Sequence, residues 1–360
     1  MVPLRAARGA GTRRVDDALS ETDPLFSVVV PTRGDDSKLL PLLDALSRQT
    51  ISPHRFEVLI AFDGVGPSDV VGDRLRGIGA RAIVLPARRG PGAARNAGAR
   101  EARGRWLAFT EDDCVPAADW LACAAERMER DPALQGIEGE TITPTGRPVR
   151  RRDGAEPTYI PTNLFVARAL FERVGGYSEQ YFDAGSGIYL REDSDFGFML
   201  EKAGAIVRVE PRARVVHPEE HPALLDPIRW ARRYEMDPLL ERRHPDQFRD
   251  RIEVARLGPF LIRRPFVRAC WAVLLALGAA VGSALLREEG LAAFWLIFAC
   301  FALVALWAKW RFHPLRLPIL PFVPFVLLAA LARGRRRAAR LAGAASPAPK
   351  PTVAPPNGQG

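Results

Sequence analysis

The chain has 360 residues, of which 48% are hydrophobic, so it has room for one large or two ordinary domains with a sizeable core. Its net charge of +9 is unevenly placed, with arginines clustered in residues 5–14 and 333–340. These clusters favour anionic lipid over nucleic acid as a partner, because no zinc-ligand, aromatic RNA-binding or recognition-helix pattern accompanies them. The four cysteines form no CxxC pair, so neither a disulfide framework nor a zinc site is indicated.

The two ends of the chain have the composition of disordered tails. Residues 1–24 are rich in Arg, Ala and Asp and lack the apolar core of a signal peptide, so we expect the soluble portion to stay on the cytoplasmic side. Residues 341–360 are rich in Ala, Pro and Gly. Between them we expect a soluble domain over 25–225, a linker over 226–264 and a membrane region over 265–340.

Short apolar runs and helical patterns alternate along the first half of the soluble domain. A further helix is predicted to begin at Trp120 and Leu121. Regular alternation of this kind predicts an α/β fold with a mostly parallel sheet flanked by helices. Strands are predicted at 26–30, 56–62, 82–85 and 105–109, and helices around 39–46, at 69–78 and at 91–103.

Polar and turn residues follow the first three predicted strands. They are Thr32-Arg33, Asp63-Gly64 and the segment 87–90. Turn chemistry alone explains the glycines. A nucleotide crevice, which open α/β sheets form at this edge, would explain the charges as well. Asp63 would then accept a hydrogen bond from a base or ribose. Arg88, Arg89 and Arg95 would be available to phosphates.

The fourth predicted strand is followed by three consecutive acidic residues, Glu111, Asp112 and Asp113. Clustered like charges repel unless a cation or a positive partner compensates them. Hard divalent cations such as Mg²⁺ prefer carboxylate oxygens, so one such cation would compensate most of the negative charge. The alternative is a solvated acidic turn that caps the following helix.

Four motifs occur in order along this half of the chain, at 28–33, 62–64, 90–98 and 109–113. Their order and spacing, from about Phe26 to His217, resemble the family 2 glycosyltransferases with the GT-A fold. The resemblance implies transfer of a sugar from a nucleotide-diphospho-sugar, with a UDP-sugar as the favoured donor. The divalent cation Mn²⁺ or Mg²⁺ would bind its diphosphate.

The resemblance also assigns residues to the donor. Asp113 would be the principal metal ligand, and His217, within a segment that resembles the late histidine of the family, would complete the metal site. Glu111 stands where the family usually has Asp, and its longer arm would reach a ribose or water. The nucleotide sugar would be held by Pro31, Thr32, Arg33, Asp63, Arg88, Arg95, Asn96, Glu111 and Asp112.

Two later segments resemble the acceptor side of the same family. Residues 161–168, with Asn163, resemble an acceptor segment, and residues 191–196 resemble the ED motif at the start of a helix. Inverting transfer needs a base that faces the acceptor hydroxyl. We expect Asp193 to be this base, with Glu192 orienting the acceptor and Asp195 as the fallback. Favourable charge at a helix N-terminus would also explain these acidic residues.

The region after the soluble domain carries two uncharged, mostly apolar runs, 269–286 and 291–308. Each is just long enough to cross a bilayer core of ~30 Å at about 1.5 Å per residue. The charged tetrad 287–290 joins them into a predicted membrane hairpin. Basic residues lie on both outer flanks, so the positive-inside rule predicts a multi-pass protein of a bacterial-type plasma membrane with its soluble domain in the cytoplasm. These residues are Arg263, Arg264, Arg268, Lys309, Arg311 and Arg316.

Two segments of this region leave alternatives open. Residues 317–332 are apolar, but Pro318, Pro321 and Pro324 weaken a straight spanning helix. We expect a re-entrant or interfacial segment, with a third span as the alternative. The amphipathic, arginine-rich linker 226–264 is predicted either to lie on the membrane surface or to pack beneath the soluble domain.

These features predict an inverting, metal-dependent glycosyltransferase that acts on a lipid-linked or cell-envelope glycan acceptor. A nucleotidyltransferase would be expected to show a Gly-rich phosphate loop with a Lys after the first strand. At this place the chain has Pro31-Thr32-Arg33-Gly34-Asp35, which contains no Lys. A processive synthase would need a QxxRW motif, and Arg229-Trp230 lacks its Gln. A non-catalytic nucleotide-binding membrane scaffold is the remaining alternative.

Overall fold

The computed structural model describes residues 23–149, 157–219, 222–257, 260–309 and 313–344. Most of both predicted tails, 1–24 and 341–360, and Arg311 of the predicted basic flank lie outside these ranges. Residues 341–344 do not belong to a tail, because they continue a helix that begins at Val323.

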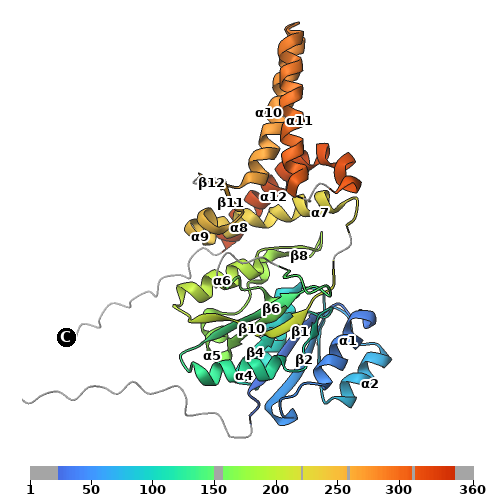
Figure 1. Ribbon diagram of the computed structural model, residues 1–360, viewed down its shortest axis with the longest axis vertical. Coiled ribbons are helices and arrows are strands. Elements are labelled where there is room, and N and C mark those ends of the chain that lie inside the picture. The colour runs from blue at the N-terminus through green and yellow to red at the C-terminus, as the bar shows by residue number, and fades with distance from the viewer. Residues whose placement is uncertain (1–22, 150–156, 220–221, 258–259, 310–312, 345–360) are drawn as a thin grey trace, which may run out of the picture.

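The soluble domain is built on one large sheet (Figure 1). Its strand order is β3-β2-β1-β4-β7-β6-β10-β5. The first four strands of the chain run parallel to one another, and β6 runs parallel to β10, while β7 and β5 are antiparallel to their neighbours. The predicted mostly parallel α/β sheet is thus confirmed. The strands are β1 (Phe26–Thr32), β2 (Phe56–Asp63), β3 (Arg81–Leu85), β4 (Trp106–Phe109), β5 (Val115–Pro116), β6 (Gly136–Ile142), β7 (Leu164–Ala167) and β10 (Val207–Val216).

Helices cover both faces of this sheet. One core packs against α1 (Asp36–Ser47), α2 (Asp69–Gly77) and α4 (Trp120–Arg130), and the other against α3 (Pro91–Glu101), α5 (Arg168–Val174) and α6 (Glu192–Lys202). Val28 and Val30 belong to the first core and Val29 to the second. A strand buried on both faces is expected to be mostly apolar, which explains the run Val28-Val29-Val30 in β1.

Local signals fix where the helices around the cleft begin. The Asp35 side chain accepts from the Ser37 amide and caps α1. Gly90, at φ +89°, precedes Pro91 in the first turn of α3. Gly98 lets α3 lie close to the sheet, because a Cβ there would come within 2.4 Å of Val29. Because its small residues let α3 pack close to the sheet, Arg95 of this helix reaches the cleft at the edge of the sheet.

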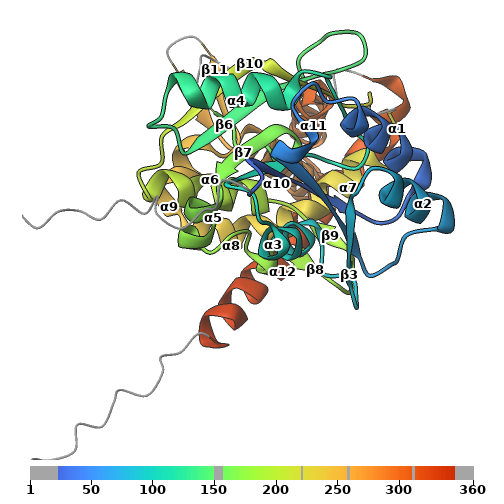
Figure 2. The same cartoon turned by 90° about the horizontal axis from the view of Figure 1, so that it is seen from below.

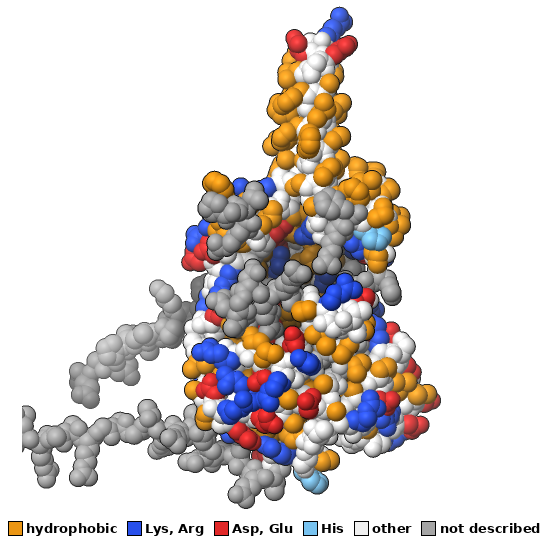
Figure 3. Space-filling model, viewed as in Figure 1, with side chains coloured by type: hydrophobic (Ala, Val, Ile, Leu, Met, Phe, Trp, Pro, Cys, Tyr) orange, Lys and Arg blue, Asp and Glu red, His pale blue; other side chains and the backbone are white. Residues whose placement is uncertain are grey.

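The chain from Asp226 onward forms a mainly helical base and a hairpin that projects from it (Figures 1 and 3). The exposed surface of the hairpin is almost entirely apolar up to a charged tip (Figure 3). By length and composition, Pro265–Leu285, Glu289–Lys309 and Pro314–Gly343 are each able to cross a membrane. The elements are α7 (Asp226–Arg233), α8 (Asp237–Arg243), α9 (Pro245–Arg251), β11 (Val254–Leu257), β12 (Phe260–Arg263), α10 (Pro265–Leu285), α11 (Glu289–Lys309) and α12 (Val323–Ala344).

Short elements complete the fold. The remaining two-stranded sheet pairs β8 (Phe182–Asp183) with β9 (Ile188–Tyr189) beside the cleft. The short 3-10 helices are η1 (Pro53–Arg55), η2 (Pro161–Asn163), η3 (Glu179–Tyr181), η4 (Tyr234–Met236) and η5 (Pro314–Phe322).

The third apolar stretch divides between η5, which holds Pro318 and Pro321, and α12. α12 lies across the base of the hairpin (Figures 1 and 2). Its basic half contacts the soluble part: Arg333 Nε is 2.9 Å from Glu235 Oε2, and Arg337 donates to Phe182 O at 2.6 Å. A membrane-spanning α12 would have to give up these contacts, so they favour the interfacial alternative.

The linker packs against the soluble domain. Met236, Leu239, Leu240 and Phe248 are buried in one cluster with Phe198 of α6. Of the two alternatives for residues 226–264, these contacts favour packing beneath the domain, between the sheet and the hairpin.

Candidate active site

A cleft of about 1610 Å³ lies at the carboxyl ends of the parallel strands. Residues that follow β1, β2, β3, β4 and β6 line it, together with the start of α6, the end of β10 and part of α7. This edge is where open α/β sheets bind ligands. Of the predicted site residues, the cleft brings together Pro31, Thr32, Arg33, Asp63, Arg88, Arg95, Glu111, Asp112, Asp113, Glu192, Asp193 and His217.

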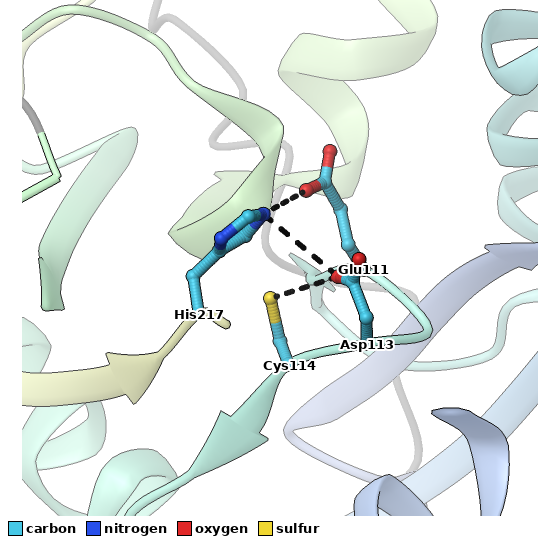
Figure 4. A group of neighbouring side chains, drawn as sticks. All are labelled: Glu111, Asp113, Cys114 and His217. Atoms are coloured by element: carbon cyan, nitrogen blue, oxygen red, sulfur yellow. Dashed lines mark hydrogen bonds and ion pairs between the residues drawn. The ribbon is translucent and has the colours of Figure 1, made fainter. Parts of the chain in front are cut away.

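The acidic loop after β4 and the residue after β10 meet at one point of the cleft (Figure 4). Val115 of β5 pairs with Val216 of β10, so the two segments lie side by side. His217 Nε2 is 3.6 Å from Glu111 Oε2 and 3.9 Å from Asp113 Oδ1. These atoms and Cys114 Sγ all lie within 4.8 Å of one another.

Hydrogen bonding and burial decide which of these atoms suit a cation. His217 Nδ1 is 2.8 Å from Pro218 O and donates to it, because a carbonyl only accepts, so Nε2 is the nitrogen that faces the carboxylates. Burial raises the pKa of the Cys114 thiol far above its ordinary value, so the thiol stays protonated. Glu111, Asp113 and His217 remain as an oxygen-rich donor set that fits Mn²⁺ or Mg²⁺.

The middle carboxylate of the loop turns toward β1. Thr32 Oγ1 donates to Asp112 Oδ2 at 2.7 Å. Burial raises the pKa of Asp112, and the charge of Asp113 adds to this effect. On the outer side of the loop, Lys38 Nζ of α1 lies 3.6 Å from Asp113 Oδ2. This lysine partly offsets the charge of the acidic loop.

Arg95 of α3 is a cation held at the floor of the cleft. Its side chain is 2% exposed, and Nη2 is 3.4 Å from Glu111 Oε1. Its Nε and Nη1 have no hydrogen-bond partner among the described residues. Buried donors are normally paired, so this guanidinium is suited to a negatively charged ligand.

Glu192 begins α6 on the opposite side of the cleft. The residue is buried, and its Oε2 has no hydrogen-bond partner in the described part of the chain. Burial, and then the charge of Asp193, raises the pKa of Glu192 to about 7. Asp193 follows it, partly exposed, and its Oδ1 accepts from the Ser194 amide at 2.7 Å. A carboxyl with the raised pKa of Glu192 is partly protonated near neutral pH and can donate as well as accept a hydrogen bond, which suits contact with an acceptor hydroxyl.

Comparison with known proteins shows which family the sheet that carries this cleft resembles. The family model described as Glycosyl transferase family 2 matches residues 27–195. Residues 27–195 therefore form a family 2 glycosyltransferase domain. Glycosyltransferase AglE of Haloferax volcanii is 24% identical over 213 residues, which are 54% of this chain and 69% of that protein. An N-acetylglucosaminyl-diphospho-decaprenol L-rhamnosyltransferase of Mycobacterium tuberculosis is 35% identical over 98 residues, which are 27% of this chain and 28% of that protein.

The fold is also that of a solved glycosyltransferase. Mannosyltransferase PcManGT from Pyrobaculum calidifontis, in complex with GDP-Man and Mn²⁺, has a TM-score of 0.52 and 20% sequence identity. The match covers 88% of this chain and 89% of that one. The GT-A fold implied by the sequence motifs is therefore present.

In this glycosyltransferase, two predicted donor residues line the cleft but are partly engaged by the protein. Asp63 accepts from the amides of Arg89 at 2.6 Å and Gly90 at 2.9 Å, and so fixes the loop that leads into α3. The guanidinium of Arg88 lies over the Phe182 ring at 5.4 Å. Both contacts fix the loop after β3 against the cleft.

Four predicted residues of the transferase do not line the cleft. The Arg89 side chain pairs with Glu179. Asn96 exchanges two hydrogen bonds with the Tyr177 backbone, at 2.8 and 2.9 Å. Asn163 accepts from Trp120 Nε1 and donates to Glu140 O and Ala213 O. Asp195 accepts from Tyr181, and its Oδ1 lies 3.1 Å from Arg243 and 2.8 Å from His244. Their polar groups are satisfied within the protein, which is the pattern of structural residues.

The transferase cleft also contains residues that the sequence motifs did not indicate. Lys38 comes from α1, and Arg147 from the segment after β6. Trp230 and Arg233 come from α7, and the Arg233 guanidinium lies 5.2 Å from the Tyr189 ring centre. The basic, amphipathic pattern of the linker was the available signal for the α7 residues, but it does not reveal which surface that helix covers.

Proposed function

We propose that the protein is an inverting, metal-dependent glycosyltransferase that moves a sugar from a nucleotide-diphospho-sugar to a hydroxyl or phosphate of a lipid-linked or cell-envelope glycan. A UDP-sugar is the favoured donor. The observation that carries the proposal is one cleft in which Glu111, Asp113 and His217 converge opposite Glu192 and Asp193. The names of the M. tuberculosis relative and the solved mannosyltransferase support a lipid-linked acceptor and a nucleotide-sugar donor.

The donor half of the cleft has the charges that a leaving nucleoside diphosphate needs. Glu111, Asp113 and His217 would hold Mn²⁺ or Mg²⁺, which supplies positive charge to the diphosphate when bound. Arg95 would hold a phosphate oxygen with the nitrogen atoms that the protein leaves unpaired. Negative charge on the leaving group grows as the glycosidic bond breaks, so this contact would be strongest in the transition state.

The acceptor half has carboxyl groups for proton removal. In our proposal Asp193 takes the proton from the acceptor hydroxyl as its oxygen attacks the anomeric carbon, and Glu192 orients the acceptor beside it. A single direct displacement inverts the anomeric centre and forms no covalent intermediate between sugar and enzyme. A non-catalytic scaffold would release no nucleoside diphosphate, and a nucleotidyltransferase would release pyrophosphate.

The membrane part of the proposal is supported by the apolar surface of the hairpin and by the basic residues at its base. With the outer flanks in the cytoplasm, the soluble domain would be on the cytoplasmic face. The cleft would then lie on the side of the membrane where nucleotide sugars are made.

A panel of nucleotide sugars tests the proposal. Full-length protein in phospholipid nanodiscs is given UDP- and GDP-sugars with Mn²⁺ or Mg²⁺, with and without membrane lipid extract, and nucleoside diphosphate release is measured. We expect release with at least one sugar, stimulated by the extract and abolished by EDTA. Asp246→Ala, which removes an exposed carboxylate of α9, is the matched control. Donor binding without release in every combination would support the scaffold instead.

A further inference from the structure

Three residues with left-handed backbone conformations belong to one network of charges. Among the described residues, Arg191, Glu253 and Arg264 have φ values of +77°, +55° and +54°. Residues with a Cβ rarely adopt this region, and such strain persists only where the surroundings impose it. Arg191 lies far from the other two in the chain, and Asp237 connects it to Arg264, which in turn binds Glu253.

Asp237 is the centre of this network. It is the first residue of α8 and is 1% exposed. Arg191 Nε donates to its Oδ1 at 2.8 Å, and Arg264 Nη2 donates to its Oδ2 at 2.5 Å. Both carboxylate oxygens are thus bound by arginines from separate elements. A buried carboxylate depends strongly on such partners, because losing either one leaves its charge poorly compensated.

On one side, the network reaches the base of the hairpin. Arg264 precedes α10, and its Nε donates to Glu253 Oε2 at 3.2 Å. Glu253 Oε1 accepts from the amide of Phe266, in the first turn of α10, at 3.1 Å. The same oxygen lies 3.9 Å from Nζ of Lys309, the last residue of α11. Both helices of the hairpin are therefore connected to Glu253.

On the other side, the network reaches the acidic pair. Arg191 lines the cleft and directly precedes Glu192 and Asp193. Its carbonyl accepts from the Asp195 amide at 2.8 Å and so closes the first turn of α6. The guanidinium bound to Asp237 and the left-handed backbone together fix where α6 begins. The direction of the two carboxyl groups depends on that position.

The geometry points to Asp237 as a positioning residue that links the catalytic pair to the membrane hairpin. Through Arg191 it holds the start of α6, and through Arg264 and Glu253 it is held by the ends of α10 and α11. Glu192 and Asp193 are aligned for transfer only when the hairpin base is correctly packed. This inference rests on the proposed function, since it assigns the alignment of the groups that would act on the acceptor.

Asp237→Asn in phospholipid nanodiscs is the direct test. The substitution keeps the shape of the side chain but removes the charge that both arginines bind. We expect kcat for transfer to fall at least about tenfold, because the catalytic pair would be misplaced. The donor Kd should stay within about twofold of the wild type. Arg263→Gln is the matched control: this arginine is adjacent to Arg264 but half-exposed and paired with Asp250. It should leave kcat and Kd unchanged.

A second variant covers the case in which Asp237→Asn does not fold. Arg264→Lys keeps the positive charge, but a single ammonium group cannot bind Asp237 and Glu253 at the same time, as the separate nitrogens of the guanidinium do. We expect an intermediate loss of kcat with unchanged donor Kd. An unchanged kcat in a folded variant, or equal losses of donor binding and kcat, would overturn the positioning role. Failure of the proposed function would be seen differently, as no nucleoside diphosphate release by the wild type.

Discussion

The two walls of the cleft hold their charges in different ways. On the donor wall, the contacts of Arg95, Lys38 and His217 with the acidic loop are 3.4 to 3.9 Å long, and Arg95 has two unpaired nitrogen atoms. Behind the wall that faces the hairpin, Asp237 binds Arg191, which lines the cleft, and Arg264 at 2.8 and 2.5 Å. Loose pairing leaves charges available to a ligand, whereas tight pairing fixes geometry. The predictions below test this division, from the largest expected effect to the smallest.

Loss of Asp113 should have the largest effect. Asp113→Ala removes a carboxylate from the donor set that fits the cation, so we expect transfer to fall about 10³-fold or more and metal-dependent donor binding to be lost. Transfer assays and calorimetric titration of the nucleotide sugar with and without Mn²⁺ measure both effects. Normal turnover would show that the metal assignment is wrong.

Asp193 and Asp195 should differ although they are two residues apart. Asp193→Asn should still bind donor but lose about 10²-fold or more in transfer, because the base is removed. Asp195→Asn should mainly lower thermal stability, because this buried carboxylate binds Tyr181, Arg243 and His244. Near-normal transfer by Asp193→Asn would remove it as the base.

Glu192 should make stability depend on pH. Its folded-state pKa is raised from 4.5 to about 7, so its contribution is fully present below pH 4.5 and is lost as pH rises through 7. The side chain introduced by Glu192→Gln cannot ionise, so the variant escapes this loss. The unfolding free energy of the variant minus that of the wild type should therefore be about 3 kcal/mol larger at pH 8 than at pH 4.5. Urea unfolding in detergent micelles at both pH values measures this. Parallel pH profiles of the two proteins would contradict the shifted pKa.

The smallest effect is expected for Asn96. Asn96→Ala removes two hydrogen bonds to the Tyr177 backbone and should cost about 1–3 kcal/mol of stability. Because Asn96 does not line the cleft, the donor Kd should change less than twofold, within about 0.4 kcal/mol. Thermal unfolding and donor titration separate the two effects. A large loss of donor affinity at unchanged stability would show that Asn96 contacts the nucleotide.

The sequence predicted best what depends on neighbouring residues. The apolar run of β1, the small residues of α3 and the start of α6 at Glu192 each have a local cause. The predicted bounds of β1 to β4 and α1 to α3 lie close to the observed ones. The acidic loop was recognisable because it follows a buried strand. Its partner His217 was indicated only by resemblance, since the pairing of β5 with β10 is not encoded in any short segment.

What the sequence could not predict depends on distant contacts. Asn96 and Asn163 stand within recognisable motifs, but their amide groups are taken up by backbone and Trp120. Arg191 and Asp237 are 46 residues apart, and nothing in the local pattern of either one indicates their contact. Trp230 lies in a helix whose amphipathic pattern fits a membrane surface and a protein surface equally well.

The position of α12 has a consequence for how the enzyme is made. α12 follows the hairpin in the chain, yet it packs on α7, α8 and η4, and α7 contributes Trp230 and Arg233 to the cleft. During synthesis, the ribosome therefore completes α10 and α11 before the helix that supports this wall exists. A nascent chain reaches its final cleft only after its hairpin has been synthesised, so a chain that stops before α12 would lack the helix that supports one wall of its cleft.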